Sequence, residues 1–377
     1  MKFDSGSIGD ALSEAGYRPT GFDYLRTALS FLVVLSHAPI ISSGAELADR
    51  MWNGPLEGFL KLILPMFFAL SGFLVAGSME RCRSVVSFAG LRLIRIYPAL
   101  TVEVLISALI IGPAVTTVGL ASYFQDPIFF RYLVNITGHI TYFLPGVFES
   151  NPFPHVVNGQ LWTVKWELIC YVILIAMMLV GAKRSSGVVA MGLLLFLAVC
   201  VADDFHDGNY EFRSVGAHVH GKILVLNFIA GVLLYQFRAR LPKSFSLGVG
   251  CLVLSYVFLK YVPGGDYFSI LPAAYLTIYI GILNSPGVWI TKLANTSYGV
   301  FLYGFSVQQF VAYEIGGYHP WWLNAALSLP LSILVGFLSW HLVEAPIMKR
   351  RKVVFQMEDT ILRGVPGWIR RNLLRWS

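Results

Sequence analysis

The strongest constraint on the fold is a repeated pattern of apolar blocks about 17–25 residues long, because helices of that length cross a hydrocarbon core about 30 Å thick. Short polar stretches separate these blocks along the 377-residue chain. Charged residues make up only 13% of the sequence, whereas a soluble domain carries about 25%. Such a chain has too little polar surface to fold in water, so we expect an all-α, polytopic membrane helix bundle.

About ten of the blocks are long enough to be transmembrane helices. The stretch Ile128–Leu144 is also apolar, but it contains an arginine, an asparagine and a histidine, which are costly at the middle of a membrane. We therefore leave it out of the predicted spans. The predicted spans begin near Phe22, Leu56, Tyr97, Leu161, Val188, Ile223, Phe245, Tyr267, Ser297 and Trp322.

The distribution of basic residues indicates the orientation of these spans. With the N-terminus in the cytoplasm and Ile128–Leu144 not crossing, most of the 28 Lys and Arg residues fall on the cytoplasmic side, as the positive-inside rule requires. A crossing at Ile128–Leu144 would place the basic tail after Pro346 outside. We therefore expect both termini to be cytoplasmic. The same rule accounts for the net charge of +7 without a nucleic-acid partner.

This topology divides the chain into three parts. Residues 1–21 form a cytoplasmic N-terminal segment, residues 22–346 form the transmembrane domain, and residues 347–377 form a basic, amphipathic cytoplasmic tail. A long outer loop runs from about residue 112 to residue 160 within the transmembrane domain. The tail has the composition of a helix that binds anionic membrane lipid, and a solvated tail that only sets the topology is the alternative.

Two ionisable residues lie within the first predicted span. Arg26 and His37 are eleven positions apart, which places them on one helix face with an axial separation of about 16 Å. A guanidinium group suits phosphate recognition, and an imidazole suits proton transfer near neutral pH. The alternatives are an arginine that extends to the inner headgroups and a histidine that makes only an interhelical hydrogen bond.

A carboxylate lies in the fourth predicted span. Glu167 needs a partner or a water-filled cavity there, and His37 is at a similar predicted depth. Glu167 would fix the tautomer of the His37 ring and raise its basicity. Lys165 is a competing partner, and a structural Lys–Glu contact at the outer interface is the alternative.

Four arginines gather at the inner end of the third predicted span. Arg92 and Arg95 lie about one helical turn apart, and Arg81 and Arg83 precede them. The group could bind a polyphosphate such as that of coenzyme A. An ordinary positive-inside cluster is the alternative.

Two further pairs carry weaker signals. His341 and Glu344, at the inner end of the last span, have the i, i+3 spacing of a single helix face, and helix capping with anchoring at the interface is the alternative. His218 and His220 have H-x-H spacing, but a third ligand with suitable spacing is missing from the sequence. We expect no metal site.

Six blocks in order resemble the acyltransferase 3 family of membrane-bound O-acyltransferases, over residues 21 to 346. The first contains Arg26 and His37, which match an Arg-x10-His motif. The other five are Phe67-Phe-Ala-Leu-Ser-Gly-Phe73, Arg92-Leu-Ile-Arg-Ile-Tyr-Pro98, Leu161-Trp-Thr-Val-Lys-Trp-Glu167 with Tyr171 after it, Ser297-Tyr298, and Val343-Glu-Ala-Pro346.

The resemblance implies an enzyme of the bacterial inner membrane that takes an acyl group, most simply acetyl, from cytoplasmic acyl-CoA and transfers it to a hydroxyl of an extracytoplasmic glycan. His37 would be the general base or a covalent acyl relay, and Glu167 would orient it. The residues expected to contact the donor are Arg26, Arg92, Arg95, Ser71, Gly72 and Tyr97, with Gly72 letting the thioester arm pass close to the helix backbone.

The sequence departs from the family in the ninth predicted span. Many members have a histidine there, where this chain has Leu302-Tyr303-Gly304. The loss of one candidate catalytic group puts more weight on His37. A transporter or flippase of lipid-linked glycans is the alternative function, since it would also have many spans and buried charges.

Overall fold

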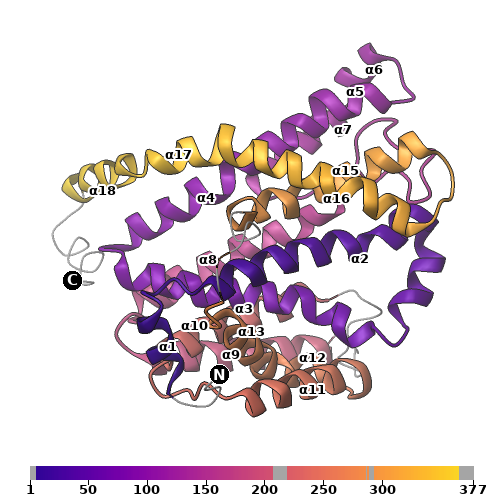
Figure 1. The fold of residues 1–377 in the computed structure, drawn as a ribbon. Helices are drawn as coiled ribbons and strands as arrows, with labels where there is room; N and C mark the ends of the chain where they lie inside the picture. Colours follow the sequence, from indigo (N-terminus) through magenta and orange to yellow (C-terminus); the bar gives the residue numbers. More distant parts are fainter. Residues whose placement is uncertain (1–5, 207–218, 286, 288–292, 365–377) are drawn as a thin grey trace.

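The computed structural model describes residues 6–206, 219–285, 287 and 293–364, and the regular structure of this part is helical throughout (Figure 1). Six helices here are long and apolar enough to cross a membrane. They are α2 (Thr20–Trp52), α3 (Glu57–Arg81), α4 (Val85–Ile106, with a helical continuation to Val115), α8 (Trp162–Leu179), α9 (Ser186–His206) and α16 (Trp321–Ser339, with a continuation to Lys349).

Four further helices correspond to the remaining predicted spans. Three of them are apolar but shorter, namely α10 (Gly221–Gln236), α11 (Phe245–Tyr261) and α13 (Ile270–Gly281), and the fourth is α15 (Ser297–Ile315). Every predicted segment therefore contains a helix, and the all-helical membrane fold is confirmed. The number of ten spans stays a prediction, because only six helices of the described part have both the length and the apolar character of a span.

The third span begins earlier than the sequence pattern predicted. Helix α4 begins at Val85, where Ser84 and Ser87 form a capping box, instead of near Tyr97. Arg92 and Arg95 thus lie inside the helix instead of opening it. The sequence pattern places these arginines at the edge of the membrane, but they face a cavity between helices, where a charged side chain does not meet lipid.

Helices α3 and α10 approach each other closely through glycine. A Cβ atom added at Gly72 would lie 2.0 Å from the carbonyl oxygen of Phe228, and one added at Gly231 would lie 2.1 Å from that of Ala69. Each helix thus presents a glycine to the backbone of the other, an arrangement common where membrane helices pack tightly. Most residues of α10 are buried as a result.

The segment between α4 and α8 consists of short helices and loops. It contains α5 (Gly112–Val115), α6 (Leu120–Gln125) and α7 (Pro127–Leu133), followed by 3-10 turns at Val134–Thr137 and Gly159–Leu161. Ile128–Leu144 therefore forms no helix long enough to cross a bilayer. A further short helix, α12 (Gly265–Phe268), connects α11 to α13.

Three short helices form the opposite end of the molecule from α5 and α6 (Figure 1). They are α1 (Ile8–Glu14), α17 (Ala345–Lys349) and α18 (Lys352–Gly364). Helix α18 packs on α4: the Ser84 hydroxyl donates a hydrogen bond to the Glu358 carboxylate, and Val354 lies against Gly90. The first part of the predicted tail is thus a helix docked on the protein, and residues 365–377 lie outside the described part.

Candidate functional site

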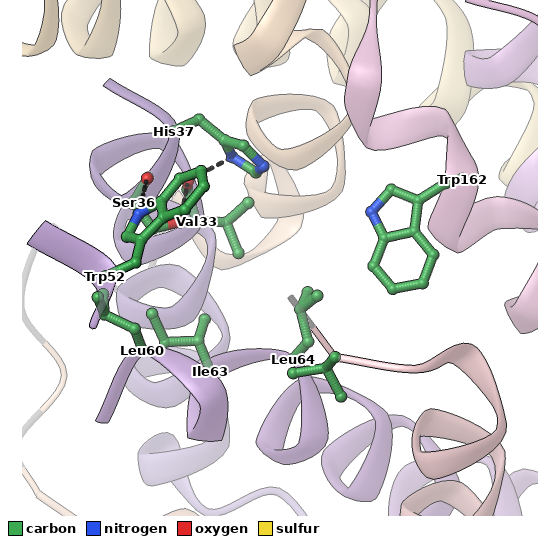
Figure 2. Close-up of a pocket in the computed structure, with 9 residues that line it drawn as sticks. Val33, Ser36, His37, Trp52, Leu60, Ile63, Leu64 and Trp162 are labelled. Carbon is green, nitrogen blue, oxygen red and sulfur yellow. Dashed lines mark hydrogen bonds between the residues drawn. The ribbon is translucent and has the colours of Figure 1, made fainter. Parts of the chain in front are cut away.

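His37 lines a cavity of about 120 Å³ between α2, α3 and the start of α8. The walls are mostly apolar, and they include Trp52 on one side and Trp162 on the other (Figure 2). The Trp52 indole is fixed by a hydrogen bond of 3.2 Å from its Nε1 to the carbonyl oxygen of Ser36. The cavity thus places one titratable ring among apolar and aromatic surfaces.

The hydrogen bond of His37 determines which ring nitrogen is free. Nδ1 lies 2.8 Å from the carbonyl oxygen of Val33, one turn earlier in α2. A carbonyl oxygen only accepts, so Nδ1 carries the proton and Nε2 of the neutral ring has the lone pair. Phe305 holds the ring by an edge-on contact with 5.3 Å between ring centroids. Nε2 is thus the atom available to take a proton in the cavity.

A second cavity, of about 250 Å³, contains three arginines. Arg26 of α2 and Arg92 and Arg95 of α4 line it together. We call it the arginine cavity. The other polar and aromatic side chains in its lining are Phe67, Ser71, Glu167, Tyr171, Asn295, Ser297, Tyr298 and Trp340.

The polar groups of this cavity have unused hydrogen-bonding capacity. Nη2 of Arg92 donates a hydrogen bond to the Ser78 hydroxyl at 3.2 Å, but the buried Nε of the same arginine has no hydrogen-bond partner. The buried hydroxyl of Tyr298 also has no partner. Buried donors without partners are rare in folded proteins. Three guanidinium groups with spare donors have the chemistry to bind phosphate oxygens.

Arg95 is held by an acidic residue from the other end of the chain. Its Nη1 lies 2.9 Å from Oε2 of Glu344, and its guanidinium carbon lies 5.2 Å from the ring centroid of Tyr298 and 5.7 Å from that of Trp340. Glu344 belongs to a π-helical turn, Trp340–Glu344, that interrupts the last span. Such turns are frequent at functional sites.

A narrow cavity of about 60 Å³ lies between the other two. It shares Leu64 with the His37 cavity, and it shares Phe67 and Ser71 with the arginine cavity. These three residues follow one face of α3 at helical spacing. The three cavities thus lie in a row along α3 between the arginines and His37, beside the face of α2 that carries both Arg26 and His37.

Comparison with known proteins identifies the family. Residues 20–341 match the family described as an acyltransferase domain. The chain belongs to the acyltransferase 3 family. An O-acetyl transferase of Shigella phage Sf6 is 25% identical over 87% of this chain and 96% of its own length. Nodulation protein 10 of Rhizobium leguminosarum bv. viciae is 27% identical over 89% of this chain and 95% of its own length. No solved structure matches.

The protein is therefore an O-acyltransferase with several membrane-spanning helices. The family resemblance drawn from the sequence blocks is confirmed, and the transporter alternative is left without support.

The predicted pairing of Glu167 with His37 is not found in the acyltransferase. Oε1 of Glu167 accepts a hydrogen bond of 2.6 Å from the Tyr171 hydroxyl, and the residue lines the arginine cavity. Trp162, at the start of α8, is the residue beside the His37 cavity. Glu167 follows it by five residues and lies about 7 Å deeper along the helix axis. Lys165 is not its partner either, because it lines another cavity.

Two further residues predicted to contact the donor lie elsewhere. Gly72 faces the backbone of Phe228 in α10, so its missing side chain allows two helices to pack and does not open a passage. Tyr97 is half-buried against the hydrophobic core and is not part of the arginine-cavity lining. Ser71, by contrast, lies where the narrow cavity meets the arginine cavity.

Two residues contact Arg95 in the acyltransferase although their sequence pattern does not predict this contact. The spacing of His341 and Glu344 leaves a functional role and a capping role open for Glu344, which is 1% exposed and pairs with Arg95. Tyr298 belongs to one of the sequence blocks without a predicted role, and its ring lies against Arg95. A carboxylate near the end of a membrane helix was the available signal, and its partner, 249 positions away, could not be inferred from spacing.

The remaining histidines that the structure describes lie apart from any metal-binding group. Among the described residues, no group of three His, Cys, Asp or Glu side chains could hold a metal ion. His341 is exposed and its Nδ1 lies 2.9 Å from the carbonyl oxygen of Phe337. The H-x-H pair is only half described, because His218 lies outside the described residues.

Proposed function

We propose that this acyltransferase moves an acyl group, most simply acetyl, from acyl-CoA to a hydroxyl of an extracytoplasmic sugar. The observation that carries the proposal is the row of cavities between the arginines and His37. This row of cavities brings a site suited to phosphates near a site with a basic nitrogen. An acyl transfer from a phosphate-bearing donor to a hydroxyl requires both sites. The printed name of the phage relative, an O-acetyl transferase, supports acetyl as the group.

Arg26, Arg92 and Arg95 are proposed to bind the phosphates of the donor. Arg92 has a free Nε donor, and in the described part of the chain Arg26 has neither a hydrogen bond nor an ion pair. Glu344 neutralises Arg95 and holds it toward Tyr298. Glu167 faces the same cavity, so we assign it to positioning the guanidinium groups and no longer to orienting His37.

His37 is proposed to remove the proton from the acceptor hydroxyl. The hydroxyl oxygen then bonds to the thioester carbon, the carbon–sulfur bond breaks, and the thiolate of CoA takes up a proton. Alternatively, Nε2 itself bonds to the thioester carbon, and the carbon–sulfur bond breaks to release the thiolate of CoA, which takes up a proton. The sugar hydroxyl then attacks the acyl carbon, the bond to Nε2 breaks, and the ring accepts the hydroxyl proton. In both routes Val33 holds the proton on Nδ1 and keeps Nε2 available.

The orientation of the protein is part of the proposal. With residues 1–21 and 347–377 in the cytoplasm, the arginine cavity opens on the side of cytoplasmic acyl-CoA. His37, about 16 Å further along α2, and the segment of about 112–160 are then on the side of the glycan. A bacterial inner membrane presents this arrangement of donor and acceptor.

Membranes that contain the protein test the proposal directly. Incubation with acetyl-CoA labelled in the acetyl group should transfer label to extracytoplasmic polysaccharide of the host cell. Membranes with His37→Gln should leave the label on CoA. Label that stays on CoA in the wild-type sample, with an acceptor-rich extract added, would contradict the proposal.

A further inference from the structure

A separate cavity of about 430 Å³ adjoins the His37 cavity. The two share Trp162. The larger one lies between α8 and the loop that follows α7, and we call it the loop cavity. Its lining consists of Gly138, His139, Ile140, Tyr142, Trp162, Lys165 and Trp166.

The loop wall of this cavity has a fixed shape. The buried side chain of Asn135 donates to the carbonyl oxygen of Thr141 at 2.8 Å and accepts from the amide of Thr141 at 2.6 Å. Gly138 has a positive φ of 88°, which glycine adopts without strain, and its amide donates to the carbonyl oxygen of Asn135. These bonds hold His139 and Tyr142 over α8, so the cavity is built before any ligand arrives.

The helix wall presents aromatic surface. Trp166 is seated against Gly221 of α10, where an added Cβ would lie 1.8 Å from the indole ring. Its position is therefore set by the packing of α8 on α10. Together with Trp162 and Tyr142 it offers flat apolar faces that suit the C–H face of a sugar ring. Aromatic rings with polar edges are common at surfaces that bind partly polar ligands.

The loop cavity is lined by two side chains that can carry a positive charge, Lys165 and His139. Lys165 is exposed and its Nζ lies 5.8 Å from the centroid of the Trp166 ring, and His139 is exposed on the opposite wall. The lining includes no carboxylate, and no salt bridge joins Lys165 to an acid within the described residues. A lysine beside tryptophan rings is placed to pair with an anionic group on a stacked sugar.

We infer that the loop cavity is the acceptor subsite and that it selects an acidic sugar, one that carries a carboxylate or a phosphate. The inference rests on the proposed function, because it takes His37 as the reacting centre next to the acceptor. Trp162 would contact both the reacting sugar and its acidic neighbour. Lys165 would bind the acidic group, and the loop from His139 to Tyr142 would cover the ring.

A pair of matched saccharides tests the inference without any acyl transfer. The purified protein in phosphatidylcholine nanodiscs is titrated with tetragalacturonate and with its methyl ester, and tryptophan fluorescence reports binding. The two probes offer the same rings to the aromatic faces, but only the free acid is charged. We expect the acid to bind about tenfold more tightly, which corresponds to one charge-assisted hydrogen bond, and the preference to shrink in high salt.

Variants show whether the preference arises in this cavity. Lys165→Gln should bring the affinity for the acid to within about threefold of that for the ester. Arg131→Gln removes an exposed positive charge from the neighbouring helix α7 that does not line the cavity, and it should keep the preference. Equal binding of the two probes to the wild type, binding of neither, or an unchanged preference in Lys165→Gln would overturn the inference.

Two further comparisons test the chemistry of the acidic group and a lipid headgroup as the alternative ligand. Tetragalacturonate and a phosphorylated tetrasaccharide distinguish a carboxylate from a phosphate as the acidic group. Nanodiscs with phosphatidylglycerol test a lipid headgroup, and loss of saccharide binding there would overturn the sugar assignment. His37→Gln should bind the acid as the wild type does. If the wild type transfers no acyl group but still binds the acid more tightly than the ester, the proposed reaction is contradicted and the acidic-sugar site is supported.

Discussion

Nη1 of Arg95 in α4 lies 2.9 Å from Oε2 of Glu344 at the end of the last span. The contact joins two segments separated by 249 positions and places a charge pair at the wall of the arginine cavity. Glu344 is almost completely buried. A buried carboxylate without its partner is strongly unfavourable, whereas a neutral pair is tolerated.

A double-mutant cycle on Arg95 and Glu344 should separate the structural role of Arg95 from its proposed role in donor binding. Arg95→Met alone leaves Glu344 unpaired and should lower the free energy of unfolding by up to about 3–5 kcal/mol. Arg95→Met combined with Glu344→Met should restore most of that loss. Thermal unfolding in detergent measures both. The double variant should still bind acyl-CoA poorly, and normal donor affinity in it would make Arg95 a structural residue only.

Arg92 should contribute to donor binding through its unpaired Nε. Arg92→Gln removes a charge-assisted hydrogen bond made equally in the ground state and the transition state, so the KM for acyl-CoA should rise roughly 10- to 100-fold with little change in kcat. Arg26→Gln should act in the same direction. Arg240→Gln, an exposed arginine on the same predicted side, serves as the control. A fall in kcat with an unchanged KM would contradict a phosphate-binding role.

His37 should be required for chemistry and not for folding. Glutamine can still donate to Val33 but cannot serve as a base, so His37→Gln should lower turnover by at least about 10²–10⁴-fold. Its expression and thermal stability should stay close to wild type. His341→Gln is a matched control, because that ring also bonds to a carbonyl oxygen one turn earlier but is exposed. Near-normal turnover in His37→Gln would reduce His37 to a hydrogen-bonding residue.

Gly72 should be required for the packing of α3 on α10. Gly72→Ala places a Cβ 2.0 Å from the carbonyl oxygen of Phe228, so the helices must separate, at a cost of about 1–3 kcal/mol or more. Gly250→Ala, in helix α11 with no atom within 4 Å of the added Cβ, should be neutral or slightly stabilising. The melting temperatures of the two variants provide the comparison, and equal values would refute the close contact.

Cysteine labelling should establish the orientation. Asn151 is buried and bonded to Gln309, so the exposed neighbour Ser150 is the better position on the predicted outer side. Ser150→Cys should react with an impermeant thiol reagent in intact cells, and the exposed Glu14→Cys on α1 should react only after lysis. The four native cysteines are buried and should give little background. The reverse pattern would invert the predicted topology.

The helices and the face of α2 that carries Arg26 and His37 were predictable from the sequence alone. Apolar length predicts a membrane helix because unsatisfied backbone groups are so costly in lipid, and the period of the helix relates two residues on the same helix without further information. The ordered sequence blocks likewise predicted the family. Each of these inferences uses residues within a single helix or a match along the chain.

The contacts between helices depended on the tertiary structure. One helical turn is about 5.4 Å, so an uncertainty of a few residues in where a span begins decides whether Glu167 meets His37 or the arginines. The sequence does not show which helix lies against Gly72, so it predicts an open passage at the position where α10 packs. The pairing of Arg95 with Glu344 and the placement of Lys165 beside Trp166 arise in the same way, since they depend on how separate helices are aligned in depth and rotation.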